Sequence, residues 1–411
     1  MSKKHHLTKL FYKIFDSYWY LRFYCYVYIF TPWAARRMRR KPVINVIFVI
    51  AELGMWKTEN LYQAMLTHPR FNPVLRVVPT PENQKAQQEV VEYLNRKGYN
   101  YRAIDEHTPL QEGFQTDIIF YQKPYHFSYY KPQRFDQNLN TLFCYLHYGA
   151  HDYVSNLTAN SILHNIAWQY YCENKSCAED IAKLMDNKGR NTIVTGTTFF
   201  DNFRHDKSEY RFPWKPQATN KKRIIYAPHF SILPDSYLKY GTFLENGHFI
   251  LEMAHKYENE VQFVFKPHPL LQPCLYKYWG KTKTDAYYAA WENLNNGQVE
   301  LGQYIDLFMT SDAMLHDCSS FTIEYIATKK PVMYLLNQSE ENLYSNRSTY
   351  AREAFALHVK GHSNKDIEAF IQAVIYQEDQ SVRMKEAYCA KYLIPENGKM
   401  AYENIIDAIL G

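Results

Sequence analysis

Imidazole and ammonium side chains occur at three places in this sequence, each directly after an apolar run that predicts a buried strand. His147 and Gly149 follow the first run, His229 follows the second, and Lys266 and His268 follow the third. A histidine suits a general base, a glycine lets the backbone approach a ligand, and a lysine beside a histidine held between two prolines suits a phosphate. A single histidine at a strand end is more often a structural residue than a catalyst, so only their convergence would indicate a site.

The fourth and most informative stretch is Met314–Leu335, in which a short apolar run leads into the polar turn His316–Ser320. A helix-like segment, Phe321–Ala327, and a second apolar run, Val332–Leu336, follow it. The pattern predicts a strand, turn, helix and strand in which the helix N-terminus offers free N–H groups to an anion. An ordinary capped helix explains the same pattern equally well. The residues that would serve such an anion site are Asp317, Ser319, Ser320 and Glu324.

Alternating apolar β-rich runs and amphipathic segments indicate doubly wound α/β domains. The alternation starts at Pro42, is interrupted by a charged, proline-containing stretch at residues 204–222, and then starts again. It therefore predicts two Rossmann-like domains, 42–205 and 206–411, that face each other across a cleft and hold their ligands at the carboxyl ends of the strands. The expected strands are Ile44–Ala51, Phe71–Val78, Asp117–Tyr121, Asn140–Leu146, Asn191–Thr195, Arg223–Ala227, Val261–Lys266, Ala313–Leu315 and Val332–Leu336. The expected helices include Trp56–Leu66, Asn83–Lys97, Ser161–Tyr171, Cys177–Asn187, Thr242–Tyr257, Tyr276–Asn295, Asp366–Tyr376 and Ala401–Leu410.

Residues 1–41 differ from the rest in charge and in aromatic content. They hold ten lysines and arginines against Asp16 alone, so the remainder of a chain of net charge +5 is slightly acidic. Ser17–Ala35 is apolar and aromatic, and the basic cluster Arg36–Lys41 follows it directly. This combination predicts an amphipathic helix on an anionic membrane surface, with packing on the protein body or a true membrane span as the alternatives.

Several classes of protein are disfavoured by what the sequence lacks. It contains no G-x-G-x-x-G or P-loop motif, and no D-x-D pair precedes a nucleotide-like site, so a metal-independent transferase is expected. His147, His151 and Asp152 have metal-ligand spacing, but Gly149 interrupts the helix that would align them. Seven cysteines without a C-x-x-C pair indicate a reducing compartment. The acidic body argues against a nucleic acid partner.

In this order, the motifs resemble those of the CDP-glycerol glycerophosphotransferase family, which includes teichoic acid polymerases and primases. The family's aspartate-x-Ser-Ser segment, with an acidic residue one turn later and a Lys-Pro before a strand, is matched in the fourth stretch. Its histidine-proline motif is matched at Phe265–Pro269, its Tyr-Ala-Pro at Tyr226–Pro228, and its Trp-His-Gly at His147 and Gly149. Tyr148 and Cys318 depart from the family pattern, as does the stretch 196–201, which lacks the usual proline and arginine.

The resemblance implies a GT-B architecture and transfer of glycerol phosphate from CDP-glycerol to a hydroxyl of a lipid-linked or cell-surface glycan or polyol, with release of CMP. It implies a peripheral protein on the cytoplasmic face of the bacterial plasma (inner) membrane, held there through residues 1–41, with no cofactor and no metal. His147 would be the base and His268 a phosphate-stabilising group, and both are expected to be catalytic. Residues expected to bind the donor are His229, Lys266, Asp317, Ser319, Ser320 and Glu324.

Two rival functions fit the same motifs. A GT-B glycosyltransferase that uses a nucleotide sugar for capsule or lipopolysaccharide synthesis would have the same order of strands and polar turns. A member without turnover, which binds a nucleotide or a lipid-linked glycan as an assembly partner, is the other rival. Retention of His147 and His268 argues against the second.

Overall fold

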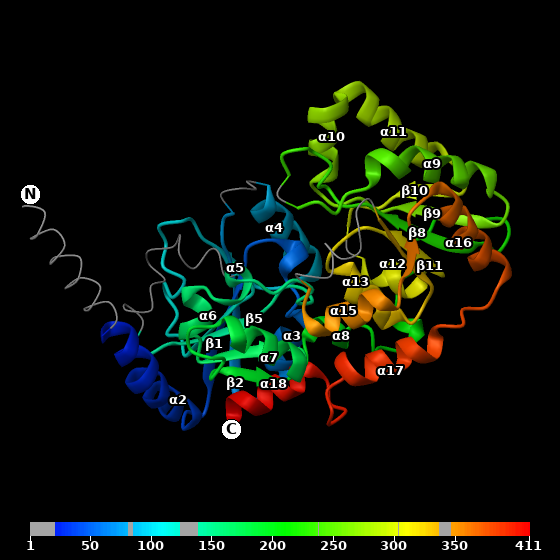
Figure 1. Ribbon diagram of the computed structural model, residues 1–411. Helices are drawn as coiled ribbons and strands as arrows, with labels where there is room; N and C mark the ends of the chain where they lie inside the picture. Colours follow the sequence, from blue (N-terminus) through cyan, green and yellow to red (C-terminus); the bar gives the residue numbers. More distant parts are fainter. Residues whose placement is uncertain (1–20, 81–84, 124–138, 237, 303, 337–346) are drawn as a thin grey trace, which may run out of the picture. The chain divides into compact units, whose positions relative to one another are not determined.

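The computed structural model describes residues 21–80, 85–123, 139–236, 238–302, 304–336 and 347–411. The chain divides into two compact units, and neither is a single continuous segment (Figure 1). Unit 1 consists of residues 1–149, 155–199 and 397–411, and unit 2 consists of residues 150–154 and 200–396. The predicted domains broke between residues 205 and 206, whereas here residues 150–154 join unit 2 and the last fifteen residues join unit 1.

Unit 1 is built on a parallel sheet whose strand order, among the described residues, is β3-β2-β1-β4-β5-β6-β7. The central strands are almost wholly buried, as continuous apolar runs with helices on both faces should be. Phe48 of β1 and Phe120 of β4 stack with ring centroids 4.8 Å apart at the centre of the sheet. The strands are β1 (Ile44–Ile50), β2 (Phe71–Val77), β3 (Tyr101–Ala103), β4 (Ile118–Tyr121), β5 (Leu142–Leu146), β6 (Gln169–Cys172) and β7 (Thr192–Val194).

Helices that each have one apolar face cover this sheet, and they include the most C-terminal helix of the chain. Ile405 and Ile409 of that helix, α18, belong to the same buried cluster as strands β1 and β2. The helices of unit 1 are α2 (Thr31–Arg39), α3 (Glu59–Thr67), α4 (Ala86–Lys97), α5 (Asn156–Ala159), α6 (Ile162–Ile166), α7 (Lys175–Leu184), α8 (Thr198–Asp201, which continues into unit 2) and α18 (Ala401–Leu410).

Unit 2 repeats the architecture with the strand order β10-β9-β8-β11-β12-β13, again parallel throughout the described residues. Its strands are β8 (Lys222–Ala227), β9 (Val261–Phe265), β10 (Gly297–Val299), β11 (Ala313–His316), β12 (Val332–Leu335) and β13 (Val359–Gly361). Its helices include α9 (Phe243–Lys256), α10 (Leu271–Trp279), α11 (Lys281–Asn293), α12 (Ile305–Thr310), α13 (Phe321–Glu324), α15 (Thr349–Ala356), α16 (Asn364–Tyr376) and α17 (Val382–Tyr392).

In both sheets the chain starts at the centre, winds to one edge, returns and winds to the other edge. This is the strand order of a Rossmann-type sheet, and the return creates a switch point beside the first strand. In unit 2 the switch point lies between β8 and β11, whose register pairs Ala227 with His316. Polar residues that follow these two strands therefore meet at one edge of the sheet.

Most predicted elements are confirmed, and the errors have simple causes. Ser161–Tyr171 was predicted as one helix but is the short helix α6 followed by strand β6. Tyr276–Asn295 is the end of α10 followed by α11, because Gly280 adopts a positive φ of 81° that a helix does not contain. Strands β3, β10 and β13 were missed, since runs of three residues carry little periodicity.

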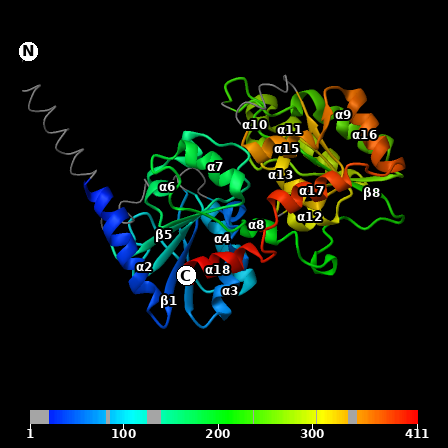
Figure 2. The same ribbon diagram turned by 60° about the horizontal axis from the view of Figure 1, so that its bottom comes forward.

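Residues 21–39 form a helical segment that includes a π-helical stretch, Tyr26–Phe30, and α2, as Figure 2 shows at the side of unit 1. One face packs on unit 1, where Tyr26 is buried and its hydroxyl donates to the Thr141 carbonyl. Among the described residues no helix combines the length and hydropathy needed to cross a membrane. Residues 1–20 of the predicted membrane segment lie outside the described part.

Candidate functional site

The carboxyl ends of β8, β9 and β11 bring together most of the residues expected to bind a donor. β8 lies between the other two strands, and register pairs its Tyr226 with Phe265 on one side and with Leu315 on the other. His229, Lys266 and Asp317 each follow one of these strand ends. The three motifs therefore converge at the switch point of unit 2, as predicted from their places after strands.

Asp317 is fully buried, and its hydrogen bonds join the turn after β11 to the loop that follows β8. One carboxylate oxygen accepts the His229 backbone N–H at 2.5 Å. The other accepts the backbone N–H of Thr242 at 2.6 Å and its hydroxyl at 2.9 Å. Burial raises the pKa of Asp317 to about 6, while these hydrogen bonds oppose the rise. Asp317 was expected to bind the donor directly, but three donors of its own chain occupy its carboxylate, which indicates a positioning role.

The His229 ring has a defined tautomer. Ser231 Oγ accepts N–H groups from Tyr240 and Gly241, at 3.1 and 2.9 Å, so its own proton is directed to His229 Nδ1, 2.8 Å away. His229 Nε2 therefore carries the proton and is a hydrogen-bond donor. Burial lowers the pKa of His229 to about 3, so the ring is neutral at pH 7. A side chain at Gly241 would lie 2.9 Å from the Ser231 carbonyl oxygen, so the loop requires glycine there.

His268 presents the same arrangement from the neighbouring strand end. Its Nδ1 accepts the Leu270 backbone N–H at 3.1 Å, which leaves the proton on Nε2. The His229 and His268 ring centroids lie 5.2 Å apart. Burial, together with the charge of Lys266, lowers the pKa of His268 to about 4. Two neutral imidazoles thus carry donor N–H groups beside one lysine, which is 6% exposed.

The turn after β11 differs from the predicted helix N-terminus. Helix α13 is one turn long and continues as a 3-10 turn, Tyr325–Thr328, so it has little dipole to offer an anion. Ser319 Oγ donates to Asp152 at 2.5 Å, and Glu324 accepts the Tyr304 hydroxyl at 2.8 Å. Ser320 begins the short helix without a side-chain cap. Ser319 and Glu324 therefore already have protein partners, which any role with a ligand must share.

Cys318, where the family pattern has a tyrosine, has a structural explanation in this chain. Its thiol donates to the Ala227 carbonyl at 3.2 Å and so joins the turn after β11 to the end of β8. Burial raises the pKa of Cys318 well above that of an ordinary thiol. The residue is therefore a neutral structural link and not a nucleophile.

His147 belongs to unit 1, where it follows β5 at the carboxyl edge of the sheet. Its Nδ1 lies 2.8 Å from the Gly149 carbonyl oxygen and 3.3 Å from the Gly149 backbone nitrogen, and the shorter contact, which is a hydrogen bond only with the proton on Nδ1, favours that tautomer. Nε2 then carries the lone pair, as a general base requires. His147 and His268 thus hold opposite tautomers, one suited to accept a proton and the other to donate a hydrogen bond.

Asp152 and Arg347 form a buried ion pair in unit 2 that the sequence did not predict. The sequence marks Asp152 only by a metal-ligand spacing, whereas its carboxylate oxygens accept hydrogen bonds from Arg347 and Ser319. Arg347 is 195 positions away along the chain, and no local pattern marks it. The Ser348 backbone N–H also donates to the Asp152 carbonyl at 2.8 Å, which holds residues 150–154 in unit 2.

These buried histidines predict a loss of stability in mild acid. Burial lowers the pKa values of His229, His268, His316 and His358 in the folded chain. Below about pH 6.5 these four histidines bind protons in the unfolded chain but stay neutral in the folded chain. The free energy of unfolding therefore falls as the pH falls. The raised pKa of Asp317, about 6, and the raised pKa of Asp152 oppose this loss, but they are two groups against four. We expect the melting temperature to drop by roughly 5–15 °C between pH 7 and pH 4.5.

Thermal melts across this pH range test the prediction. His316→Gln should reduce the drop, because one of the four rings is removed. His107→Gln is the matched control, since His107 is a highly exposed side chain and should leave the drop unchanged. A melting temperature that stays constant from pH 7 to pH 4.5 would contradict the prediction.

Comparison with known proteins gives a family match and a common fold. The model of the family described as CDP-Glycerol:Poly(glycerophosphate) glycerophosphotransferase matches residues 155–411, more than half of the chain. No curated protein sequence matches. Among solved structures, a putative UDP-N-acetylglucosamine 2-epimerase from Listeria monocytogenes is 13% identical with a TM-score of 0.57, covering 90% of this chain and 96% of its own.

Two further structures have the same two-domain fold. The UDP-GlcNAc 2-epimerase from Neisseria meningitidis, bound to UDP-GlcNAc, is 15% identical with a TM-score of 0.53, over 89% of this chain and 99% of its own. A variant of the wall teichoic acid polymerase TagF is 13% identical with a TM-score of 0.54, and the match covers 100% of this chain and 98% of the TagF chain. These likenesses confirm the predicted GT-B type of fold with two parallel α/β domains.

Proposed function

Because this chain belongs to the CDP-glycerol:poly(glycerophosphate) glycerophosphotransferase family and is an enzyme of that class, we propose that it transfers glycerol phosphate from CDP-glycerol to a hydroxyl of a lipid-linked or cell-surface glycan or polyol. The other product is CMP. The acceptor oxygen attacks the β-phosphorus, the bond from that phosphorus to the bridging oxygen breaks, and the bridging oxygen leaves with CMP. Positioning and electrostatic stabilisation supply most of the rate in such transfers.

Each expected catalytic residue has a role that its tautomer supports. His147 Nε2 takes the proton of the acceptor hydroxyl, since its Nδ1 is engaged with Gly149. The Nε2–H groups of His229 and His268 donate to phosphate oxygens, and Lys266 supplies positive charge. The observation that carries this proposal is the pairing of two neutral imidazole donors with a buried lysine at the switch point of unit 2.

The remaining donor contacts are proposed from the turn after β11. Ser319 and Ser320 donate backbone N–H groups to the diphosphate, and the Ser320 hydroxyl donates as well, since the Ser319 hydroxyl already donates to Asp152. Glu324 accepts a hydrogen bond from a ribose hydroxyl in addition to the one from the Tyr304 hydroxyl, because a carboxylate can accept several hydrogen bonds. Asp317 holds the His229 loop for the same donor. No metal is required by these roles.

The test is incubation of the purified protein with CDP-glycerol, CDP-ribitol, CMP-sugars and UDP-sugars, with a glycerol-phosphate acceptor. We expect CMP release from CDP-glycerol alone, and CDP-glycerol should also raise the melting temperature, since a ligand of the folded state stabilises it. Turnover of a nucleotide sugar instead would replace the proposal with the glycosyltransferase rival. Nucleotide binding without turnover of any donor would favour an assembly role.

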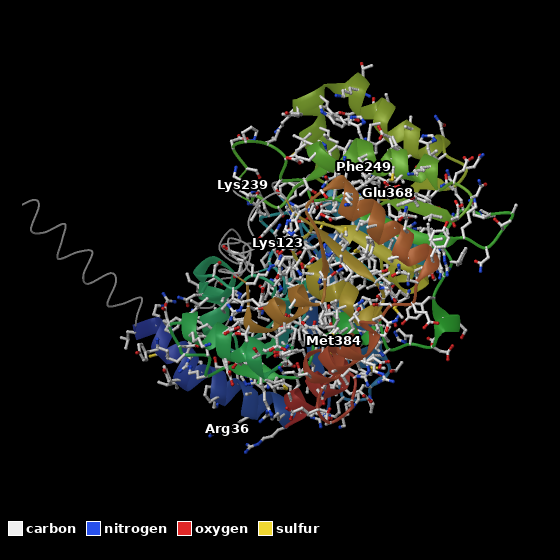
Figure 3. All side chains as sticks on the ribbon, turned by 45° about the vertical axis from the view of Figure 1, so that its right-hand side comes forward. Arg36, Lys123, Lys239, Phe249, Glu368 and Met384 are labelled. Carbon is white, nitrogen blue, oxygen red and sulfur yellow. The ribbon has the colours of Figure 1, made fainter. Side chains whose placement is uncertain are left out.

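We also propose that the face of residues 21–41 that is not packed on unit 1 lies on an anionic membrane surface. The guanidinium of Arg37 lies 4.9 Å from the Trp33 ring centroid, and Arg36 projects from α2 into solvent (Figure 3). Exposed aromatic and aliphatic side chains flanked by arginines fit the boundary between headgroups and acyl chains. The large apolar residues exposed on this segment are Leu21, Tyr24, Tyr28, Ile29 and Trp33.

Membrane binding is best tested by substitution, because deletion of residues 1–41 would also remove Tyr26 and Met38 from the core of unit 1. We expect Leu21→Ser, Ile29→Ser and Trp33→Ser together to reduce co-flotation with anionic vesicles by roughly 10-fold or more, since each buried apolar side chain contributes to binding. Tyr376→Ser is the matched control, because Tyr376 is 70% exposed on α16 of unit 2. Equal flotation of the triple variant and wild type would refute this membrane face.

A further inference from the structure

Arg347 is a buried arginine that uses only part of its hydrogen-bonding capacity within the described residues. Its Nη1 donates to a carboxylate oxygen of Asp152 and, over 3.2 Å, to Oγ1 of Thr322. Its Nε and Nη2 are shielded from solvent and have no acceptor among the described residues. These two nitrogens form the edge of a guanidinium that can bind two oxygens of one carboxylate or phosphate side by side.

The ion pair with Asp152 uses Nη1 and does not explain why the Nε–Nη2 edge of Arg347 is buried without an acceptor among the described residues. A single cationic nitrogen, such as a lysine supplies, would suffice for that pair. The guanidinium is also fixed in direction, because the Phe355 and Tyr334 ring centroids lie 4.8 and 5.4 Å from its carbon. A buried donor without an acceptor is costly, so a rigid charged edge of this kind calls for an oxygen ligand.

The guanidinium is joined to the candidate site by short contacts. The second oxygen of Asp152 accepts the Ser319 hydroxyl, so one carboxylate connects Arg347 to the turn after β11. Tyr334, which packs against Arg347, donates its hydroxyl to the Asp317 carbonyl at 3.2 Å. All of these residues belong to unit 2. Arg347 therefore lies beside the residues that are proposed to hold the donor.

We propose that the Nε–Nη2 edge of Arg347 binds a phosphate group of the nucleotide diphosphate donor, and that Asp152 is a positioning residue that holds both Arg347 and Ser319. This inference rests on the proposed function, from which it takes its ligand. Arg347 adds a permanent positive charge to a site whose two imidazoles are neutral. It also explains why residues 150–154 are fixed within unit 2.

Titration calorimetry with CDP-glycerol, inorganic pyrophosphate and cytidine tests the inference. Arg347→Lys keeps the charge but loses the two-nitrogen edge, so we expect its Kd for CDP-glycerol to rise roughly 10–100-fold, as the loss of a charge-assisted hydrogen bond predicts. Asp152→Asn should also raise the Kd for CDP-glycerol, and neither substitution should alter the Kd for cytidine. Arg223→Lys is the matched control, because Arg223 pairs with Asp312 at the opposite end of β8. An unchanged Kd for CDP-glycerol in Arg347→Lys would overturn the inference.

Two further results separate this inference from the proposed function. If wild-type protein binds pyrophosphate but not CDP-glycerol, the proposed function fails, and the pyrophosphate titration of Arg347→Lys still decides the role of the arginine. If a variant does not fold, wild-type crystals soaked with CDP-glycerol decide it instead. A phosphate oxygen about 3 Å from both Nε and Nη2 supports the inference, whereas a phosphate bound elsewhere overturns it.

Discussion

His147→Ala and His268→Ala are each expected to lower kcat for CMP release by roughly 10²–10⁴-fold, the usual contribution of a general base or of a preorganised donor. The two residues should differ in what can replace them. Glutamine offers an N–H near the position of Nε2, so His268→Gln should recover part of the loss. His147→Gln should not, because an amide nitrogen cannot accept the proton of the acceptor hydroxyl.

Steady-state kinetics with CDP-glycerol and a glycerol-phosphate acceptor measure this difference. His107→Ala in unit 1 and His255→Ala in unit 2 are suitable controls, since both residues are exposed and lie outside the candidate site. Turnover within a factor of a few of wild type in either alanine variant would remove that histidine from the mechanism. Equal rescue of both positions by glutamine would mean that His147 acts as a donor and not as the base.

The second large effect is expected in stability. Asp317→Ala removes the acceptor of three buried donors, and we expect it to cost roughly 3–5 kcal/mol of folding free energy. In a unit of this size, that corresponds to a fall in melting temperature of roughly 6–20 °C. Thermal unfolding followed by circular dichroism measures the shift. The loop that carries His229 should lose its position at the same time, so residual activity should be low even below the melting temperature.

Asp312→Ala is the matched control for this effect. Asp312 also accepts from a strand of the same sheet, through the Arg223 backbone and side chain, but its side chain is 30% exposed. Water can therefore replace the lost acceptor, and we expect a cost of about 1 kcal/mol or less. A similar melting temperature for the Asp312 and Asp317 variants would show that the Asp317 hydrogen bonds do not stabilise the fold more than those of Asp312.

The fold was predictable because its central strands are continuous apolar runs, such as Ile44–Ile50 and Val261–Phe265, separated by amphipathic helices. Such patterns follow from burial on both faces of a parallel sheet. Short strands carry less of this pattern. Gln169–Cys172 is an interior strand of four residues, two of them tyrosines, that is separated from helix α6 by two residues, so its sequence did not distinguish a strand from the continuation of that helix. Membership of a unit also depends on contacts distant in sequence, which is why residues 150–154 and 397–411 were assigned to the wrong neighbours.

The candidate site was predictable where a strand precedes a polar residue, because parallel strands bring their carboxyl ends to one edge. In this way the sequence predicts that His229, Lys266, His268 and Asp317 meet at one edge, and the strands that they follow are neighbours in the sheet. The sequence did not distinguish residues available to a ligand from residues that hold the others, and Asp317 belongs to the second kind. Arg347 was missed because its partner is 195 positions away and its environment comes from four separate segments.

The interleaving of the two units has a consequence for the order in which the chain folds during synthesis. Domains generally fold as they emerge, with the N-terminal one first. Here Ile405 and Ile409 belong to the core of unit 1, and Gln169 donates to the Ala408 carbonyl, so unit 1 is completed only after all of unit 2 has been made. Until α18 has been synthesised, part of one face of the unit 1 sheet stays uncovered. The nascent chain is prone to aggregate during this time.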